Sequence, residues 1–429
     1  MIDQKNCTAV KSLVAIDVAK EWNVVLTQSE GRGDRRTFKV ANRAADHNRF
    51  VEFMKSLPGP VRVGLEPTGD YHRPLAYRLL KEGFEVVSIS SVALARFREA
   101  RYGTWDKNDP KDAQVILSML EQNMVQIYHD PLLAGTHDLQ ELANTYFHIT
   151  LARTRLQHSL LLHYIPLYFP EFGKYWVATR SAWFIRFLLR FPTAAAVRAL
   201  TEEEFTKEAW PLVGKKVEKR RKIAELYSMA GESIGLPVAL ESPAIEMFRL
   251  QLQRYEDLNE DREHLDAKAQ ELLAENKDFQ RLLTLPGIGA ILALTIMAEA
   301  GDLRRFSHHR QFLNYCGLDL SKSQSGQSRG RETLSKRGNK RLRMVFWMAG
   351  LRAVHMRENA FRDKYERYLA DNTLDADRKR KALTAVAAKV ARVVYAVIKN
   401  ESDYVRFFEQ RLPSGSIPLT RAVEATSTS

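Results

Sequence analysis

The sequence predicts an α/β domain in its N-terminal third, a long helical middle and a mainly helical C-terminal domain. Up to about residue 130, short β-rich runs alternate with helical segments, which is typical of α/β domains. Farther along, arginine and aromatic residues interleave in segments rich in helix formers. With 429 residues, 45% of them apolar and 27% charged, the chain is expected to form a globular protein of several domains.

The N-terminal elements follow one another in a recognisable order. Three β-rich runs separated by short turns predict an antiparallel meander, and two further strands are each preceded by a helix. The expected strands are residues 12–17, 22–27, 35–40, 61–65 and 84–89, and the expected helices are residues 43–56, 71–82 and a third from about residue 109. The order βββαβαβ, followed by a helix, is that of an RNase H-like domain.

Four acidic residues are placed so that they could converge. Asp17 and Glu66 each directly follow an apolar strand, and Asp109 and Asp112 lie three residues apart, on one face of the expected helix. Four converging carboxylates repel one another unless a cation neutralises them, and Mg²⁺ prefers oxygen ligands. Asp109 taken alone reads better as a helix cap before Pro110, and the strand-end acids could equally be solvated turns. The set in this order favours a metal site.

The middle of the chain contains a heptad-like pattern. Eight of eleven positions at alternating spacings of three and four are apolar, with charged residues on the flanks, and this predicts a coiled coil of about five heptads. The alternative is a helical hairpin within one chain, and we favour self-association. The eleven positions are Phe248, Gln251, Tyr255, Leu258, Arg262, Leu265, Ala269, Leu272, Asn276, Phe279 and Leu283.

The C-terminal third opens with the segment Leu285-Pro-Gly-Ile-Gly-Ala290, which is similar to the hairpin of a helix-hairpin-helix element. In such a hairpin, Gly287 and Gly289 would let backbone N–H groups approach a phosphate at a helix N-terminus. An ordinary tight turn between packed helices is the alternative.

A basic, serine-containing segment follows. Residues 321–345 hold eight basic residues and one acid, a net charge of +7 out of +13 for the chain, which indicates a polyanionic partner. A flexible cationic loop with hydroxyl groups suits a nucleophile beside a bound phosphodiester, whereas a solvated loop is the simpler interpretation. Its serines are Ser321, Ser323, Ser325 and Ser328.

Other sequence features bear on the cellular compartment and on metal binding. Cys7 and Cys316 are the only cysteines, so no disulfide framework is expected and a reducing compartment is indicated. His308 and His309 are weak zinc candidates. The N-terminus lacks a signal-peptide pattern, and the longest charge-free run, residues 282–298, is interrupted by the glycine-containing turn. We expect a cytoplasmic protein without a membrane span.

Several motifs together resemble a family of DEDD-type bacterial insertion-sequence transposases, whose relatives include Piv-type DNA invertases. The N-terminal matches are Ile16-Asp17-Val18-Ala19-Lys20, Glu66-Pro-Thr-Gly69 and Lys107-Asn-Asp109-Pro-Lys-Asp112-Ala113. The C-terminal matches are Leu285-Pro-Gly-Ile-Gly289, Tyr315-Cys-Gly-Leu318, Ser325-Gly326 and Lys336-Arg-Gly-Asn339-Lys-Arg-Leu-Arg343. Both sets occur in the family's order and cover most of the chain. The middle, at about 150 residues, looks long for the family.

The resemblance implies a fold and a domain division. It implies a RuvC-like DEDD domain and a C-terminal transposase domain that contains the serine loop. The expected boundaries are residues 1–130 for the DEDD domain, 131–245 for a helical linker, 246–283 for the coiled coil, 284–400 for the transposase domain and 401–429 for a tail.

The resemblance also implies a chemistry. Family members are understood to cut and rejoin DNA with Mg²⁺ held by the four acids and a serine that becomes a covalent phosphoserine. The family's serine precedes a glycine, which among the loop serines selects Ser325, with Ser323 second. Asn339 is expected to cap the following helix. Expected nucleic-acid contacts are Gly287, Gly289, Lys322, Arg329, Arg331, Lys336, Arg337, Lys340 and Arg343.

The partners implied by the resemblance are donor and target double-stranded DNA, a structured guide RNA encoded by the element, and further copies of the chain in a dimer or tetramer. Such a protein would be associated with the bacterial nucleoid. Three other functions compete with this interpretation: a RuvC-like nuclease without a covalent intermediate, a nucleic-acid-binding protein with a degenerate site, and a tyrosine recombinase using Tyr315. The four intact acids argue against the second, and the apolar surroundings of Tyr315 argue against the third.

Overall fold

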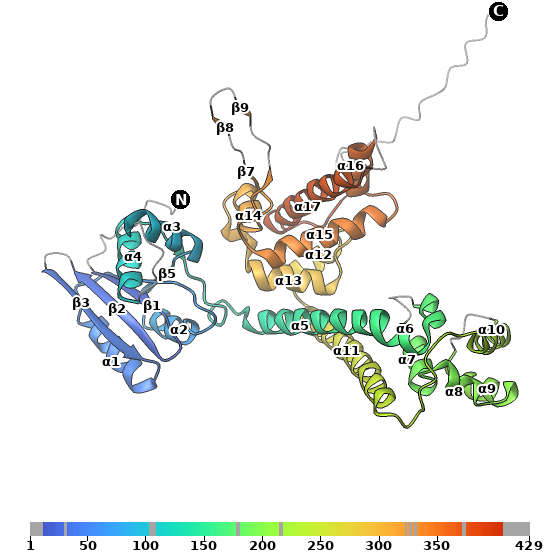
Figure 1. The fold of residues 1–429 in the computed structure, drawn as a ribbon. Coiled ribbons are helices and arrows are strands. Elements are labelled where there is room, and N and C mark those ends of the chain that lie inside the picture. The colour runs from blue at the N-terminus through green and yellow to red at the C-terminus, as the bar shows by residue number, and fades with distance from the viewer. Residues whose placement is uncertain are drawn as a thin grey trace, which may run out of the picture. The chain divides into compact units, whose positions relative to one another are not determined.

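The chain divides into two compact units, Met1–His137 and Asp138–Ser429, each with its own hydrophobic cores (Figure 1). A computed structural model describes residues 12–29, 32–102, 109–176, 181–213, 218–321, 324–325, 328–329, 333–370 and 375–405. Cys7 and the expected tail beyond residue 405 lie outside these ranges.

The first unit is built on a six-stranded mixed sheet in the order β3-β2-β1-β4-β5-β6 (Figure 1). Strands β1, β4 and β5 run parallel, whereas β2, β3 and β6 pair antiparallel with their neighbours. The predicted meander and the two later strands are confirmed, and the short edge strand β6 was not predicted. The strands are β1 (Ser12–Asp17), β2 (Trp22–Ser29), β3 (Arg32–Ala41), β4 (Val61–Leu65), β5 (Glu85–Ser88) and β6 (Gln126–Ile127).

Helices cover both faces of this sheet. On β1, Val14 and Ile16 pack into a core with α1 and α2, while Ala15 between them packs into a separate core with α3 and α4. Successive strand residues point to opposite faces, so one continuous apolar run serves both cores. The helices are α1 (Ala44–Lys55), α2 (Arg73–Lys81), α3 (Ser91–Tyr102) and α4 (Asp109–Glu121).

The second unit is almost entirely helical, as the sequence predicts. None of the described helices is both long and apolar enough to cross a membrane. The α-helices are α5 (His137–Ser159), α6 (Ile165–Tyr168), α7 (Ser181–Arg190), α8 (Ala194–Arg198), α9 (Glu202–Ala209), α10 (Lys219–Gly231), α11 (Pro243–Leu273), α12 (Lys277–Leu283), α13 (Ala290–Ala300), α14 (His309–Tyr315), α15 (Lys340–His355), α16 (Ala360–Leu369) and α17 (Ala376–Lys399). A π-helical turn, Leu160–Tyr164, and the 3-10 helices Pro170–Tyr175 and Leu303–Arg305 complete it.

Two cores lie within this unit. The core formed by residues 160–255 is rich in stacked aromatic rings, such as Phe172 between Phe184 and Phe187. The other, formed mainly by residues 269–398, is largely aliphatic. Helix α11 contributes to both, with Tyr255 in the aromatic core and Ala269 in the aliphatic one, and therefore joins them into one unit.

The predicted five-heptad coiled coil is not formed as a single helix. Helix α11 ends at Leu273, and Asn276 caps α12 by accepting a hydrogen bond from the Phe279 backbone N–H at 3.0 Å. The apolar seam is used inside the chain, because Phe248 and Tyr255 are fully buried in the aromatic core. The polar residues predicted to set the register contact neighbouring elements instead.

Those contacts correspond to the intramolecular alternative. Arg262 of α11 donates to the Tyr146 hydroxyl of α5 at 2.6 Å, and Arg153 of α5 donates to Asn259 of α11 at 2.5 Å. The two contacts show that α5 and α11 run antiparallel. Self-association through α11 stays a prediction. Because the seam residues Phe248 and Tyr255 are buried within the chain, a second copy could contact only the exposed face of the helix.

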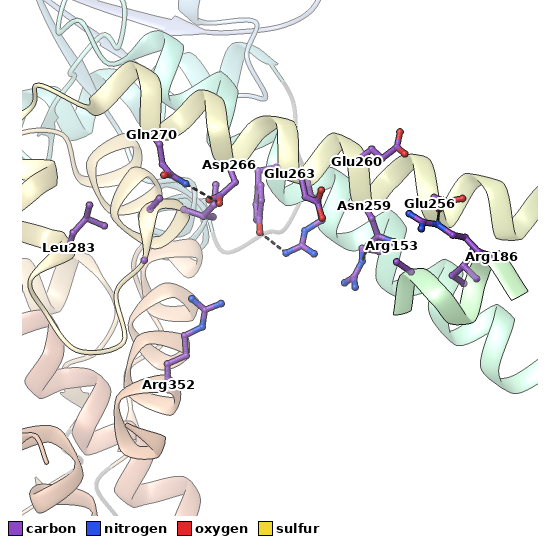
Figure 2. A pocket seen from close by; sticks show the side chains of 17 residues that line it. Arg153, Arg186, Glu256, Asn259, Glu260, Glu263, Asp266, Gln270, Leu283 and Arg352 are labelled. Carbon is purple, nitrogen blue, oxygen red and sulfur yellow. Dashed lines mark hydrogen bonds and ion pairs between the residues drawn. The ribbon is translucent and has the colours of Figure 1, made fainter. Parts of the chain in front are cut away.

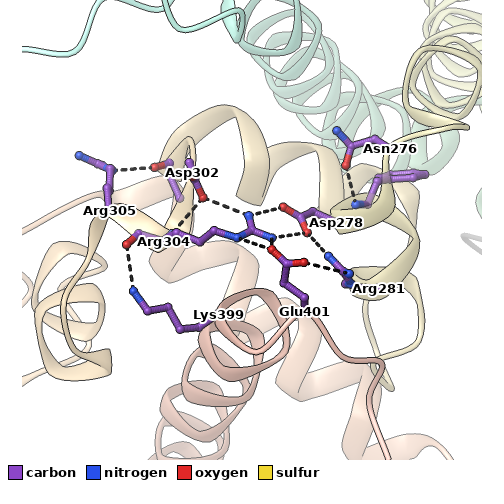
Figure 3. A network of polar contacts seen from close by, with 10 residues as sticks. Asn276, Asp278, Arg281, Asp302, Arg304, Arg305, Lys399 and Glu401 are labelled. Carbon is purple, nitrogen blue, oxygen red and sulfur yellow. Dashed lines mark hydrogen bonds and ion pairs between the residues drawn. The ribbon is translucent and has the colours of Figure 1, made fainter.

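A network of charged side chains closes the aliphatic core at the end of α17 (Figure 3). Arg304 donates to both carboxylate oxygens of Asp278, at 2.7 and 3.0 Å, and also contacts Asp302 and Glu401. Arg281 donates to the same Asp278 carboxylate at 2.8 Å. The hydrogen bonds from Arg304, and then that from Arg281, lower the pKa of Asp278. The Asp278 carboxylate in turn raises the pKa of Arg304.

We predict that Asp278→Asn destabilises the second unit by about 1–2 kcal/mol at pH 7, since hydrogen bonds to charged groups are among the stronger ones. The pKa of Asp278 is lower in the folded than in the unfolded protein. Ionised Asp278 therefore stabilises the fold fully above its unfolded-state pKa, and this contribution is lost as the pH falls through its folded-state pKa. Denaturant unfolding of both proteins at pH 7 and pH 3 should show the difference shrinking at low pH. Asp302→Asn, at the more exposed acid, is the control; a pH-independent difference would contradict the prediction.

Candidate functional site

Two of the predicted acids lie side by side at one edge of the sheet. Strands β1 and β4 pair in parallel, with Ile16 opposite Leu65, so the next residues along each strand are Asp17 and Glu66. Asp17 is nearly buried, and Glu66 is half-buried. The carboxyl ends of neighbouring parallel strands therefore bring these two residues together, as the sequence predicts.

Both acids fall on the face of the sheet that α4 covers. Ala15 packs into the core of α3 and α4, and Asp17, two residues later, shares its face. On β4, a Cβ atom at Gly64 would lie 2.6 Å from the Leu120 side chain of α4, so the face of Gly64 and Glu66 is the same one. The alternation of the two strands thus directs the acids towards the helix that carries the other pair.

The direction of α4 places its N-terminal turn at the same edge. Glu121, at the helix end, accepts a hydrogen bond from Gln28 at 2.9 Å, and Gln28 pairs with Leu13 near the start of β1. Helix α4 packs mainly along β1, so it runs antiparallel to that strand. Its first turns, with the fully buried Asp112, therefore lie towards the strand end that carries Asp17.

The fourth acid, Asp109, is the first residue of α4, and its side chain lies outside the described part of the structure. The two predicted roles of Asp109, as a metal ligand and as a helix cap, therefore stay predictions. Among the side chains that are described, no three His, Cys, Asp or Glu residues are grouped so that they could hold one metal ion. The three described acids, Asp17, Glu66 and Asp112, lie towards one edge of the sheet, but their side chains are not grouped as a metal site.

A basic residue that the sequence analysis did not single out lies against this site. Arg98 of α3 forms an ion pair with Asp112 at 2.6 Å, and both side chains are largely buried. A buried carboxylate is costly unless a cation compensates its charge, and here the guanidinium supplies part of that compensation. The signal that could have revealed Arg98 is its position one turn after the buried Leu94, on the face of α3 that packs on α4.

The predicted serine loop has regular backbone structure at its described positions. β7 (Leu320–Ser321) pairs antiparallel with β10 (Thr333–Leu334), and β8 (Gln324–Ser325) pairs with β9 (Ser328–Arg329). The described residues of this segment, which we call the serine ribbon, therefore pair as short antiparallel strands, of which Figure 1 labels β7, β8 and β9. Strands of only two residues, wholly polar in β8 and β9, are too short to show the apolar alternation by which strands are predicted.

Ser325 lies in β8, directly opposite Ser328 in β9, and Gln324 lies opposite Arg329. The side chains of β8 and β9, and the whole of Lys322, Ser323 and Arg331, lie outside the described residues. The choice between Ser325 and Ser323 therefore stays a prediction.

The basic turn after the ribbon is held by its own residues. Asn339 caps α15, as predicted, by accepting hydrogen bonds from the backbone N–H groups of Arg341 and Leu342 at 2.9 and 3.0 Å. The Arg343 guanidinium donates to the carbonyls of Cys316 and Lys336, so part of its hydrogen-bonding capacity maintains the turn.

Three other predicted phosphate contacts in this turn are exposed: Lys336, Arg337 and Lys340.

Cys316 lies in the core next to this turn. Burial raises the pKa of its thiol, so the cysteine is neutral.

The predicted hairpin joins α12 to α13, but its two glycines differ in role. Gly287 has φ +88°, and a Cβ there would lie 2.2 Å from the Ala349 carbonyl oxygen and 2.9 Å from the Ala353 nitrogen of α15. Its lack of a side chain allows close packing on α15, which is the tight-turn alternative. Gly289, at the start of α13, has only the Arg352 guanidinium nearby, 3.7 Å from a built Cβ.

We predict that Gly287→Ala destabilises the second unit by about 2–4 kcal/mol, because alanine would add a backbone clash to an unfavourable positive φ. Gly289→Ala is the matched control and should cost about 1 kcal/mol or less. Denaturant unfolding of the full chain, followed by circular dichroism, measures both; equal effects would show that close packing does not explain the glycine.

A cavity of about 740 Å³ lies beside this hairpin (Figure 2). It is bounded by α5, α7, α11 and the start of α13, and Arg352 of α15 reaches it. Its walls carry four arginines and four acids, so their charges balance and do not favour a polyanion. These residues are Arg153, Arg186, Arg262, Arg352, Glu256, Glu260, Glu263 and Asp266.

Comparison with known proteins finds two segments of the chain that match domains of one family. Residues 14–170 match the DEDD transposase domain of the IS110 type, and residues 279–366 match the family described as "Transposase IS116/IS110/IS902 family". The chain carries both transposase domains of the IS110/IS116/IS902 family. The first match contains the four acids, and the second contains the hairpin, the serine ribbon and the cap of α15. A DEDD transposase domain implies a RuvC-like fold, in agreement with the strand order of the first unit.

Individual relatives agree with these domain matches. The chain is 25% identical to a probable family 20 transposase of Pseudomonas aeruginosa, over 92% of this transposase and 98% of the relative. It is 28% identical to the transposase for insertion sequence element IS1111A of Coxiella burnetii, but that match spans only 41% of this chain and 47% of the relative. An insertion element IS116 protein of Streptomyces clavuligerus is 24% identical over 90% and 94% of the two chains.

Proposed function

We propose that this transposase cuts and rejoins double-stranded DNA with the acids of its first unit and Ser325 of its second. The observation that carries the proposal is the placement of Asp17 and Glu66 at adjacent parallel strand ends, facing the helix that bears Asp112. Carboxylates gathered at a sheet edge are suited to phosphoryl-transfer chemistry. The basic residues after the serine ribbon supply charge for a phosphate backbone.

The predicted ligands in the first unit are of a chemical type that binds divalent cations. The described candidates offer only carboxylate oxygens, which are the ligands that Mg²⁺ prefers, and Asp17, Glu66, Asp109 and Asp112 would hold the ion. A bound Mg²⁺ would supply a Lewis acid that offsets negative charge on the reacting phosphate. Because Arg98 already pairs with Asp112, we propose that the carboxylate is shared between the guanidinium and the ion, or exchanged from one to the other.

The proposed covalent step uses the Ser325 hydroxyl. Its Oγ attacks the scissile phosphorus, the bond from phosphorus to the leaving sugar oxygen breaks, and that oxygen gains a proton as the serine loses one. Rejoining reverses this chemistry, because a free sugar hydroxyl of the new partner strand attacks the phosphoserine and releases Ser325. Lys322, Arg329, Arg331, Lys336 and Arg337 are proposed to offset the charge of the phosphate.

Two partners follow from the family resemblance and stay proposals. The chain's formal charge of +13 suits binding to more than one nucleic-acid segment, and a structured guide RNA is proposed beside the DNA. Further copies of the chain are proposed to bring the acids of one subunit to the serine of another.

A metal-dependent nuclease is the second candidate. The observation that favours it is that all the predicted acids belong to the first compact unit, so hydrolysis by water would need no residue of the second. Free DNA ends and no covalent adduct would be its signature.

The test uses the full chain, Mg²⁺ and a DNA duplex that carries the native flanks of the element, together with RNA transcribed from those flanks. Sequencing should detect rejoined strands, and a chelator should abolish them. Cut but unjoined DNA would favour the nuclease, and binding without any cleavage would favour a non-catalytic protein.

A further inference from the structure

Helices α16 and α17 enclose a pocket that plays no part in the site described above. Its volume is about 550 Å³, and four of its six lining residues are basic, with no acid among them. They are Lys364, Arg367, Tyr368, Lys389, Arg392 and Val393. Only Lys364 falls within a family-matched segment, which ends at residue 366.

The two walls repeat one sequence pattern. Helix α16 presents Lys364, Arg367 and Tyr368, and α17 presents a lysine, an arginine and a valine at the same spacing of i, i+3 and i+4. This spacing places the three side chains of each helix on one face, so both basic faces turn towards the same space.

The four cations influence one another across the pocket. Burial lowers the pKa of Lys364, and the nearby positive charges of Arg392 and Arg367 lower it further. Burial likewise lowers the pKa of Lys389, with Lys364 and Arg367 adding to the effect and the acid Asp363 opposing it. The arrangement concentrates positive charge in a partly desolvated place, which an anion would relieve.

The described contacts leave the arginines with donors to offer. Arg367 and Arg392 each use Nε to bond a carbonyl of their own helix, at 3.3 and 3.2 Å. Among the described residues, neither guanidinium has an ion-pair partner. Lys389 instead holds the start of α16, donating to the Ala360 carbonyl at 2.6 Å.

The positive surface continues beyond the pocket. Helix α14 packs on α17. Burial lowers the pKa of His309 at the start of α14, and the charges of His308, Arg392 and Arg310 lower it further. Tyr368, at the pocket's rim, is 44% exposed and offers a ring face.

We propose that this pocket binds backbone phosphate of a nucleic acid, as an anchor separate from the serine ribbon and the hairpin. Two guanidiniums and two ammoniums suit phosphate oxygens, and the exposed tyrosine ring suits a neighbouring sugar or base. The proposal rests on the proposed function only in taking a nucleic acid as substrate; it requires neither the acid site nor Ser325.

The test compares two double variants of the full chain that lose the same charge. Arg367→Gln/Arg392→Gln empties the pocket of both guanidiniums, and Arg380→Gln/Lys381→Gln removes two cations near the start of α17, outside it. Fluorescence anisotropy with labelled duplex DNA, and separately with an RNA hairpin, gives affinities from 50 to 300 mM salt. Circular dichroism melts confirm that both variants fold.

We expect the pocket variant to lose about tenfold or more in affinity, and its salt dependence on DNA to fall by about 1.8 in slope, since each phosphate contact contributes about 0.9. The control should change less in both. A loss of affinity for DNA, for RNA or for both supports the proposal and identifies which nucleic acid the pocket binds. A pocket variant whose affinities match those of the control overturns it. Cleavage is not measured, so failure of the proposed chemistry would leave this readout intact.

Discussion

Replacing Glu66 by glutamine should reduce strand cleavage about 10³-fold or more while DNA binding persists, because removing an ionised group that acts on transition-state charge costs several kcal/mol. Glu66 is half-buried at the strand edge beside Asp17, so the isosteric amide should leave the fold intact. Cleavage of a labelled duplex at saturating protein measures the effect, and anisotropy measures binding.

Asp112→Asn should reduce cleavage as strongly as Glu66→Gln. It also leaves the buried Arg98 guanidinium without its ion-pair partner, and breaking a buried pair costs about 3–5 kcal/mol of stability. The double variant Asp112→Asn/Arg98→Met removes both charges and should regain stability without regaining cleavage. If cleavage survives in Glu66→Gln and in this double variant, the acids do not form the catalytic cluster.

The second large effect is expected at the serine ribbon. Incubation of the transposase with labelled target DNA should give a covalent protein–DNA adduct on a denaturing gel, and Ser325→Ala should remove it completely, since alanine has no nucleophile to offer. Ser328→Ala is the matched control, because Ser328 lies opposite Ser325 in the same ribbon and should keep the adduct.

Two outcomes would redirect this assignment. An adduct that persists in Ser325→Ala and disappears in Ser323→Ala would move the nucleophile by two residues. Cleavage with free ends in every serine variant would favour the metal-dependent nuclease.

Features that depend on residues close together in the chain could be predicted from the sequence. The five main strands follow from their β-rich runs, and the strand ends place Asp17 and Glu66 without knowledge of the whole fold. The cap at Asn339 and the turn between α12 and α13 also depend on a few adjacent residues. Local geometry governs each of these, so local patterns predicted them.

Tertiary packing decided the rest. The heptad pattern of α11 could serve a second chain or the same one, and the fold buries Phe248 and Tyr255 in the chain's own core, because hydrophobic burial is satisfied by any apolar surface. The close packing of Gly287 on α15 could not be predicted without the position of that helix. The pairing of Arg98 with Asp112, and the meeting of two basic helix faces between α16 and α17, join residues 14 or more positions apart. Charges so placed act on each other through space, and only the packing of one helix on another sets their distance.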